Sequence, residues 1–155
     1  MKQLEQEKGQ EVFPALQRVL PAHFLLTAQH STRSLFSFAD TQHTPPTLMM
    51  HQQFSSSEWR VLLPLLRGFP SVIVYETLLA ALLRIKVRES RELMQQACRD
   101  GGKRAILRSL RDTVSRLRTK VQPFSFDIAT RTGKGYVITI PEPVATRAQR
   151  DEALR

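Results

Sequence analysis

The sequence predicts an α+β fold, because strand-like runs occupy its two ends and helical periodicity occupies its middle. Near the N-terminus, three short runs rich in Phe, Leu and Thr are separated by turn-forming residues. Further along, Leu107, Leu110, Val114, Leu117 and Val121 recur at alternating spacings of three and four, which places them on one stripe of a helix. Near the C-terminus, two β-rich runs flank a turn that contains glycine. We therefore expect a small N-terminal antiparallel sheet, a helical middle and a C-terminal β-hairpin.

Residues 1–53 are expected to form one short helix and the small sheet. Pro14 suits the first helical position of an amphipathic helix within residues 12–20. The expected strands are residues 23–29, 34–39 and 47–54. We interpret this segment as a candidate interface, for a second copy of the chain or for another protein.

Four helices are expected in the middle of the chain. Ser55 and Glu58 form the sequence pattern of a capping box, so a helix should begin there, bend at Pro64 and stop at Gly68. The other expected helices are residues 75–83, 89–99 and 103–121.

The C-terminal hairpin is expected to pair residues 126–130 with residues 136–140, around a basic turn at residues 131–135. The tail, residues 141–155, is polar and is expected to be flexible.

Basic residues are concentrated in one part of the chain. The formal net charge is +9, and residues 84–120 alone carry twelve Lys and Arg against four Asp and Glu. Such a block suits a polyanion, either nucleic acid or an anionic membrane surface. A solvated helix face explains the charge equally well, so the charge by itself does not decide the function.

Other functional classes find little support in the sequence. No apolar run is long enough to span a membrane, and the polar, acidic N-terminus does not resemble a secretory signal. The single cysteine, Cys98, allows no intramolecular disulfide, which favours a reducing cytoplasm. We find no nucleophile–base set and no metal-ligand spacing among the histidines, so we expect no enzyme activity, no cofactor and no metal.

Four segments within residues 54–140 carry a recognisable pattern in a fixed order. They are FSSSEW from Phe54, VIVYETLL from Val72, RSLRDTVSRLRTKV from Arg108 and IATRTGKGY from Ile128. Together they resemble the OmpR/PhoB-type winged-helix effector domain of bacterial response regulators. The resemblance implies a winged helix-turn-helix, in which residues 103–121 form the recognition helix and the hairpin forms the wing.

The resemblance also implies a set of DNA-contacting residues. On the recognition helix these are Arg108, Ser109, Asp112, Thr113, Ser115, Arg116 and Arg118. At the tip of the wing they are Arg131, Thr132 and Lys134. Arginine can bond guanine or phosphate, and Ser or Thr suits phosphates and adaptable base contacts. Asp112 could accept a hydrogen bond from a cytosine amino group, or it could repel the phosphate backbone of the DNA.

Among the departures from the family, two bear most on function. The connection between the second helix and the recognition helix is longer and holds the extra helix expected near residues 89–99, where the family contacts RNA polymerase. Residues 1–53 are too few for a receiver domain, so we expect no control by phosphorylation of a receiver in the same chain.

Two functions remain open. The first is sequence-specific binding of double-stranded DNA by a bacterial transcription regulator in the cytoplasm, with RNA polymerase, a signalling protein or a second copy of the chain as candidate partners. The second is a winged-helix module that binds proteins and reads little or no DNA sequence. A preference for one DNA sequence over bulk DNA would distinguish them.

Overall fold

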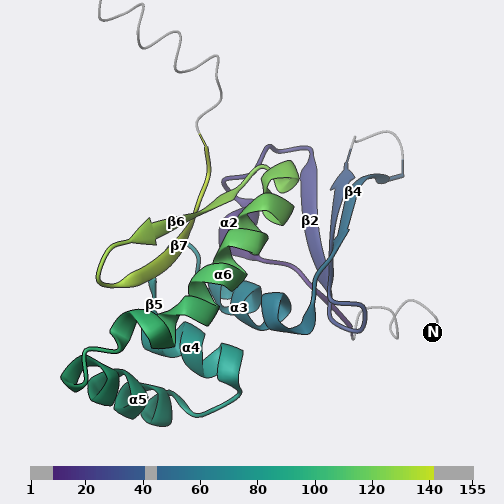
Figure 1. Cartoon of the computed structure of the whole chain (residues 1–155). Coiled ribbons are helices and arrows are strands. Elements are labelled where there is room, and N and C mark those ends of the chain that lie inside the picture. The colour runs from purple at the N-terminus through teal and green to yellow at the C-terminus, as the bar shows by residue number, and fades with distance from the viewer. Residues whose placement is uncertain (1–8, 41–44, 142–155) are drawn as a thin grey trace, which may run out of the picture.

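The computed structural model describes residues 9–40 and 45–141, and Figure 1 shows how their elements are arranged. Over these residues the chain is a mixed α+β structure with two antiparallel sheets. The helices are α2 (Pro14–Gln17), α3 (Ser56–Gly68), α4 (Tyr75–Leu83), α5 (Val87–Arg99) and α6 (Lys103–Val121), with a short 3₁₀ turn, η2 (Gln122–Phe124). The strands are β1 (Gln10–Glu11), β2 (Phe24–Gln29), β3 (Ser34–Ala39), β4 (Thr47–Gln53), β5 (Ile73–Val74), β6 (Asp127–Arg131) and β7 (Gly135–Thr139). Of the predicted tail, only Pro141 lies within the described residues.

The first sheet has the strand order β1-β2-β3-β4 and confirms the three predicted N-terminal strands. Its residues alternate between two faces, as a strand period of two requires. Leu26, Ala28 and Leu35 are buried on the inner face. On the outer face, the Phe36 ring stacks on the His51 ring with centroids 4.5 Å apart. The sheet therefore packs on the helices through one face only.

Helix α2 is shorter than predicted, but it has a clear role at the edge of the sheet. The predicted helix within residues 12–20 is a single turn that begins at Pro14. The side chain of Gln17 donates to the carbonyl oxygen of Phe24 and accepts a hydrogen bond from the backbone N–H of Leu26. Because β1 pairs only with the other end of β2, the Gln17 amide satisfies backbone groups that a longer neighbouring strand would otherwise bond.

Helix α3 begins with the predicted capping box. The backbone N–H of Ser55 donates to Glu58 Oε1 at 2.8 Å, and the backbone N–H of Glu58 donates to Ser55 Oγ at 3.2 Å. Pro64 lies inside the helix without ending it. The buried side of α3, including Leu62 and Leu65, belongs to the same core as Leu35 of the sheet. Residues 1–53 and 54–140, which the sequence suggested as separate parts, thus share one hydrophobic core over their described residues.

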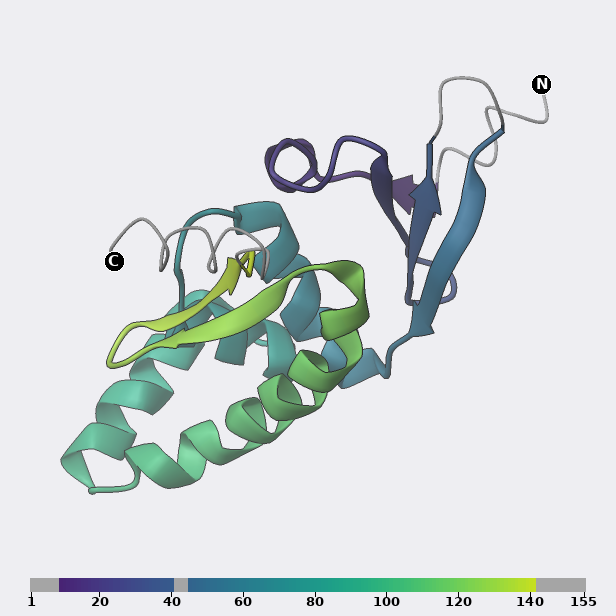
Figure 2. The ribbon, with the colours of Figure 1, turned by 90° about the horizontal axis from the view of Figure 1, so that it is seen from above.

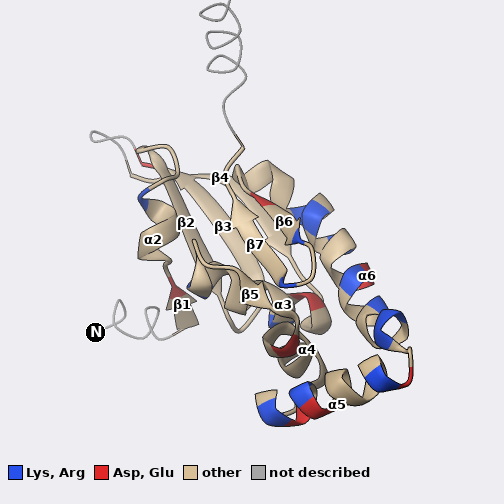
Figure 3. Ribbon diagram, turned by 90° about the vertical axis from the view of Figure 1, so that its left-hand side faces the viewer, with Lys and Arg blue, Asp and Glu red and all other residues tan. Residues whose placement is uncertain are grey.

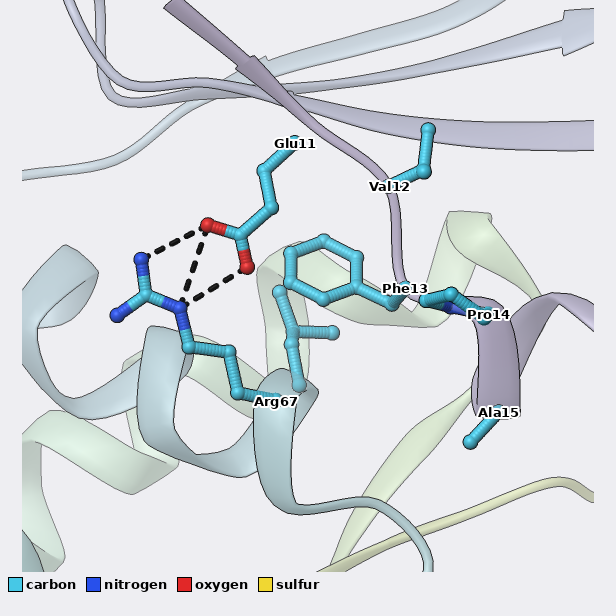
Figure 4. A pocket seen from close by; sticks show the side chains of 7 residues that line it. Glu11, Val12, Phe13, Pro14, Ala15 and Arg67 are labelled. Carbon is cyan, nitrogen blue, oxygen red and sulfur yellow. Dashed lines mark hydrogen bonds and ion pairs between the residues drawn. The ribbon is translucent and has the colours of Figure 1, made fainter.

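An ion pair between Glu11 of β1 and Arg67 in the last turn of α3 connects the first strand to this helix, as Figure 4 shows. The Arg67 guanidinium donates from Nη2 to Glu11 Oε1 at 2.8 Å and from Nε to Glu11 Oε2 at 2.9 Å. His30 Nε2 lies 3.0 Å from Glu11 Oε1. The Arg67 hydrogen bonds are the main reason that the pKa of Glu11 is lower than its ordinary value.

The inserted helix predicted at residues 89–99 is α5, which begins two residues earlier, at Val87. Helix α4 ends because Arg84 adopts the left-handed conformation, and the chain then turns into α5. Ser90, which is buried, donates from Oγ to the carbonyl oxygen of Glu76 at 2.7 Å. This bond and buried Met94 hold α5 against α4. In Figure 2, α5 lies at the end of the molecule opposite the four-stranded sheet.

The second sheet has the order β5-β7-β6. The predicted hairpin is confirmed, but its strands extend further into the turn, because Arg131 pairs with Gly135. The turn itself is Thr132, Gly133 and Lys134, and Gly133 has φ +77. Gly135 permits the close approach of β5, since a Cβ atom there would lie 1.9 Å from the carbonyl oxygen of Ile73.

Candidate nucleic-acid interface

Helix α6 has one buried side and one exposed side. The predicted apolar stripe is buried, from Leu107 through Leu110, Val114 and Leu117 to Val121, and this side packs against the other helices. Nineteen residues give the helix a length of about 28 Å at 1.5 Å per residue. Such a helix is long enough to cross a major groove with its exposed side.

The exposed side of α6 is basic. Seven Lys and Arg lie in this helix against a single acidic residue, Asp112. Figure 3 shows the basic residues along α6 and on α5. Five of the predicted contact residues on α6 are exposed: Arg108, Ser109, Asp112, Ser115 and Arg116. At the tip of the β6–β7 hairpin, all three predicted residues, Arg131, Thr132 and Lys134, are exposed as well.

The structure does not place Thr113, a predicted contact residue, on the exposed side of α6. Thr113 is 1% exposed, because it borders the buried stripe and neighbouring elements cover it, although Ser109, one helical turn earlier, is exposed. Its hydroxyl donates to the carbonyl oxygen of Ser109 at 2.9 Å and accepts from Arg116 Nη2 at 3.3 Å. Thr113 therefore helps to position Arg116 and is not itself part of the exposed surface.

Arg118 also differs from the prediction, because it is half-buried and bonded to the hairpin. Its Nε donates to the carbonyl oxygen of Ile128 at 2.8 Å, and its Nη2 donates to Thr130 Oγ1 at 2.6 Å. Strand β6 packs beside the C-terminal half of α6, which brings these acceptors within reach. The main role of Arg118 in this structure is to join α6 to β6.

A groove of about 320 Å³ separates α6 from the hairpin. It is lined by Tyr75, Arg111, Val114, Ser115, Arg118, Thr130, Thr132 and Tyr136. Arg111 is exposed here and was not among the predicted contacts. Its position could have been found from the helical period, since it precedes Ser115 by four residues and Arg118 by seven.

Two of the residues that line this groove are tyrosines. The rings of Tyr75 and Tyr136 meet edge to face, with centroids 5.7 Å apart. Burial raises the pKa of Tyr136, and Tyr75 adds to this rise, while Arg111 and Arg118 oppose it. The phenol therefore stays protonated at neutral pH and can act as a hydrogen-bond donor. Together with the arginines, it gives the groove a chemistry that suits phosphate oxygens.

Glu58 is a buried carboxylate beneath the exposed side of α6, and sequence reasoning assigned it only to the capping box. Its side chain is 2% exposed. Oε1 lies 2.7 Å from Lys120 Nζ, and Oε2 lies 3.7 Å from Arg116 Nε. Burial by itself raises the pKa of Glu58, but the hydrogen bonds from Lys120 and Ser55 outweigh it, so the pKa is lower than its ordinary value. Glu58 is therefore ionised at neutral pH.

A second basic groove lies beside α5. It has a volume of about 760 Å³, and Arg91, Arg99 and Lys103 are among its lining residues. Glu76 lines it too, as do the apolar side chains of Val74 and Met94. Helix α5 thus extends the basic surface beyond the N-terminal end of α6.

Residues 9–40 and 45–141 hold no group of three His, Cys, Asp or Glu side chains placed to bind one metal ion. None of the helices in these two ranges combines the length and the apolar composition that crossing a membrane requires. No family model matches the chain, and neither a curated protein nor a solved structure matches it.

Proposed function

We propose that the chain is a winged-helix protein that binds double-stranded DNA in a sequence-specific manner and regulates transcription. The observation that carries this proposal is the pairing of α6 with the β6–β7 hairpin. Arg108 and Arg116 are exposed on the helix, Arg131 and Lys134 are exposed at the hairpin tip, and a basic groove separates the two elements. A long basic helix beside a basic hairpin is the arrangement with which winged helices bind a major groove and the adjacent backbone.

In the proposed complex, α6 lies in the major groove. Arg108 and Arg116 are the residues best suited to read base edges, because a guanidinium can donate two parallel hydrogen bonds to guanine. The hairpin tip then contacts the neighbouring phosphates. The groove between them, with Arg111 and Tyr136, receives a segment of the backbone. These phosphate contacts give affinity and orientation, and the base contacts give specificity.

The element order supports a relationship to OmpR/PhoB-type effector domains. A four-stranded antiparallel sheet is complete before α3 begins, and a short strand between α3 and α4 joins the C-terminal hairpin. On this basis we propose a bacterial, cytoplasmic regulator that is not switched by a receiver within these residues. The inserted α5 occupies the connection that contacts RNA polymerase in that family, which makes its outer surface a candidate polymerase contact.

The proposal is tested by selection from a library of randomised DNA duplexes, after affinity for random duplexes has been measured. We expect an enriched motif with the wild-type protein. Arg116→Ala should cost about 1–3 kcal/mol of binding free energy and relax the preference at one position. Arg18→Ala is the matched control, because Arg18 is an exposed arginine next to α2. Binding that depends steeply on salt but enriches no motif would contradict the proposal, since counterion release alone would explain it.

A second candidate function is protein binding through the first sheet. Strand β4 is an edge strand with no partner beyond it in the described ranges, and its Leu48 and Met49 are 53% and 62% exposed. Such an edge suits the addition of an extended strand from another protein. If the library enriches no motif, this function becomes the leading one. Replacing Met49 by Lys should then weaken association with a partner and leave bulk DNA binding unchanged.

A further inference from the structure

We infer that Glu58 is a positioning residue that restrains the cations of the recognition surface and thereby makes DNA binding more selective. This inference rests on the proposed function and deepens it. Two cations of α6, Arg116 and Lys120, share the single carboxylate of Glu58 from the start of α3.

The burial of Glu58 calls for an explanation beyond helix capping. A glutamate is almost never fully buried unless it is paired. Capping requires only that an acceptor reach the backbone N–H of Ser55, and an exposed side chain can do this. Here Oε1 also accepts from Lys120 Nζ, while Oε2 faces Arg116 Nε at 3.7 Å. Each oxygen of the carboxylate thus has a cation from the same helix.

The two cations are held to different degrees. Lys120 is 2.7 Å from the carboxylate, its side chain is 33% exposed, and its ammonium lies 5.7 Å from the centre of the Phe54 ring. Arg116 is 56% exposed, and its ion pair is longer than a hydrogen bond. Its Nη2 donates to Thr113 at 3.3 Å. A guanidinium has five N–H donors, so a restrained Arg116 keeps donors for a ligand. The structure therefore holds Lys120 firmly and Arg116 loosely.

This difference has a consequence for selectivity. A phosphate is an anion, so the Glu58 carboxylate both competes with it for Arg116 and repels it. A guanine edge carries no net charge, so Arg116 can donate two parallel hydrogen bonds to it without this repulsion. Glu58 thus lowers the affinity for bulk DNA more than the affinity for the matching sequence. Without the negative charge of Glu58, both Arg116 and Lys120 become available to any phosphate.

Two variants separate this role from helix capping. Glu58→Gln keeps an acceptor for the backbone N–H of Ser55 but removes the charge beside Arg116 and Lys120. Ser55→Ala removes the hydroxyl that caps the N–H of Glu58 and leaves the carboxylate in place. If Glu58 is only a cap, the two variants should alter DNA binding alike.

The experiment measures the affinity of the full chain for a random duplex and for its selected duplex, from 50 to 200 mM salt, with folding checked by circular dichroism. For Glu58→Gln we expect tighter binding to the random duplex at low salt. In a plot of log affinity against log salt concentration, the slope of this variant should be steeper than that of the wild type by about one to two. The reason is that each added phosphate contact contributes roughly 0.9 to the slope. The preference for the selected duplex should fall, whereas Ser55→Ala should keep the wild-type slope and preference.

A further variant covers the case in which Glu58→Gln does not fold. Lys120→Met keeps an apolar stem near Phe54 and leaves Arg116 as the one cation within 4 Å of Glu58 among the described residues. We then expect Arg116→Ala to cost less affinity for the selected duplex than it does with Lys120 present, because the carboxylate holds Arg116 more strongly.

The experiment distinguishes failure of this inference about Glu58 from failure of the proposed function. If the wild-type protein selects no sequence, the proposed function fails and this inference fails with it. If the wild-type protein does select a sequence, a Glu58→Gln variant with unchanged slope and preference overturns the inference alone. A Lys120→Met background in which Arg116→Ala costs as much as before overturns it too.

Discussion

The guanidinium of Arg118 donates from Nε to the carbonyl oxygen of Ile128 at 2.8 Å, and this bond joins α6 to the C-terminal hairpin. The second bond from the same side chain goes to Thr130, on the same strand. One arginine therefore sets the spacing between the two elements that border the basic groove.

We predict that Arg118→Ala acts on stability more than on base preference. Losing a charge-assisted bond to a half-buried carbonyl group should lower the free energy of unfolding by about 1.5–3 kcal/mol. Chemical denaturation measures this loss. Arg108→Ala is the control, because the Arg108 side chain is exposed on α6 and makes no side-chain hydrogen bond among the described residues, so the unfolding curve of this variant should match the wild type. If Arg118→Ala unfolds like the wild type and Arg108→Ala is destabilised, Arg118 does not join α6 to the hairpin.

A substitution at Gly135 should damage the second sheet. An alanine Cβ would lie 1.9 Å from the carbonyl oxygen of Ile73, and backbone cannot move aside as a flexible side chain can. We expect Gly135→Ala to lower the free energy of unfolding by about 1–3 kcal/mol or more, as overpacking does. Gly102→Ala is a suitable comparison, since its nearest neighbouring atom would be 3.9 Å away. Equal unfolding midpoints for the two variants would refute the close approach of β5 and β7.

Stability should fall in acid partly because of Glu11. Its pKa is lowered in the folded protein, chiefly by the hydrogen bonds from Arg67, below the ordinary value of 4.5. A lowered pKa contributes stability above pH 4.5, and this contribution is lost as the pH falls through the folded-state pKa. The melting temperature of Glu11→Gln should therefore lie below that of the wild type at pH 7. The gap should narrow as the pH falls below 4.5 towards the folded-state pKa of Glu11. A gap that stays constant with pH would contradict this account.

The attachment of α5 should depend on Ser90. The buried hydroxyl donates to the carbonyl oxygen of Glu76 at 2.7 Å, and an alanine would leave that acceptor without this bond. We expect Ser90→Ala to cost about 1 kcal/mol and to speed amide hydrogen exchange in α5 more than in α3. Ser109→Ala serves as the control, because Ser109 is exposed on α6. Unchanged exchange in α5 would show that Met94 packing alone holds the helix.

Much of the fold was predictable because its signals are local. The stripe in α6, the capping box of Ser55 and Glu58, and the Leu- and Phe-rich run of β3 each arise within a few residues. Helix α2 was predicted too long, since its short apolar pattern could not show that the chain leaves the helix after Gln17 to continue towards β2. The start of α5 was missed by two residues, because Lys86 offers no side-chain cap that marks it.

The candidate site was predictable only in part. The helical period shows which residues oppose the buried stripe, and Arg108, Asp112 and Arg116 are exposed as it indicates. It does not show what packs beside the stripe. Thr113 and Arg118 both border it, and neighbouring elements decide that the first is buried and the second is bonded to β6.

The sequence by itself determined the main helices, the strands β2, β3, β4, β6 and β7, and the basic character of one side of α6, because short-range periodicity and composition encode them; the two-residue strands β1 and β5 carry no such local signal. Only the tertiary structure decided which cations on that side are restrained. Glu58 and Lys120 are 62 positions apart in the chain, yet their charged atoms lie 2.7 Å apart. No local pattern records such a distance, since it depends on how α3 and α6 pack against each other around their shared core.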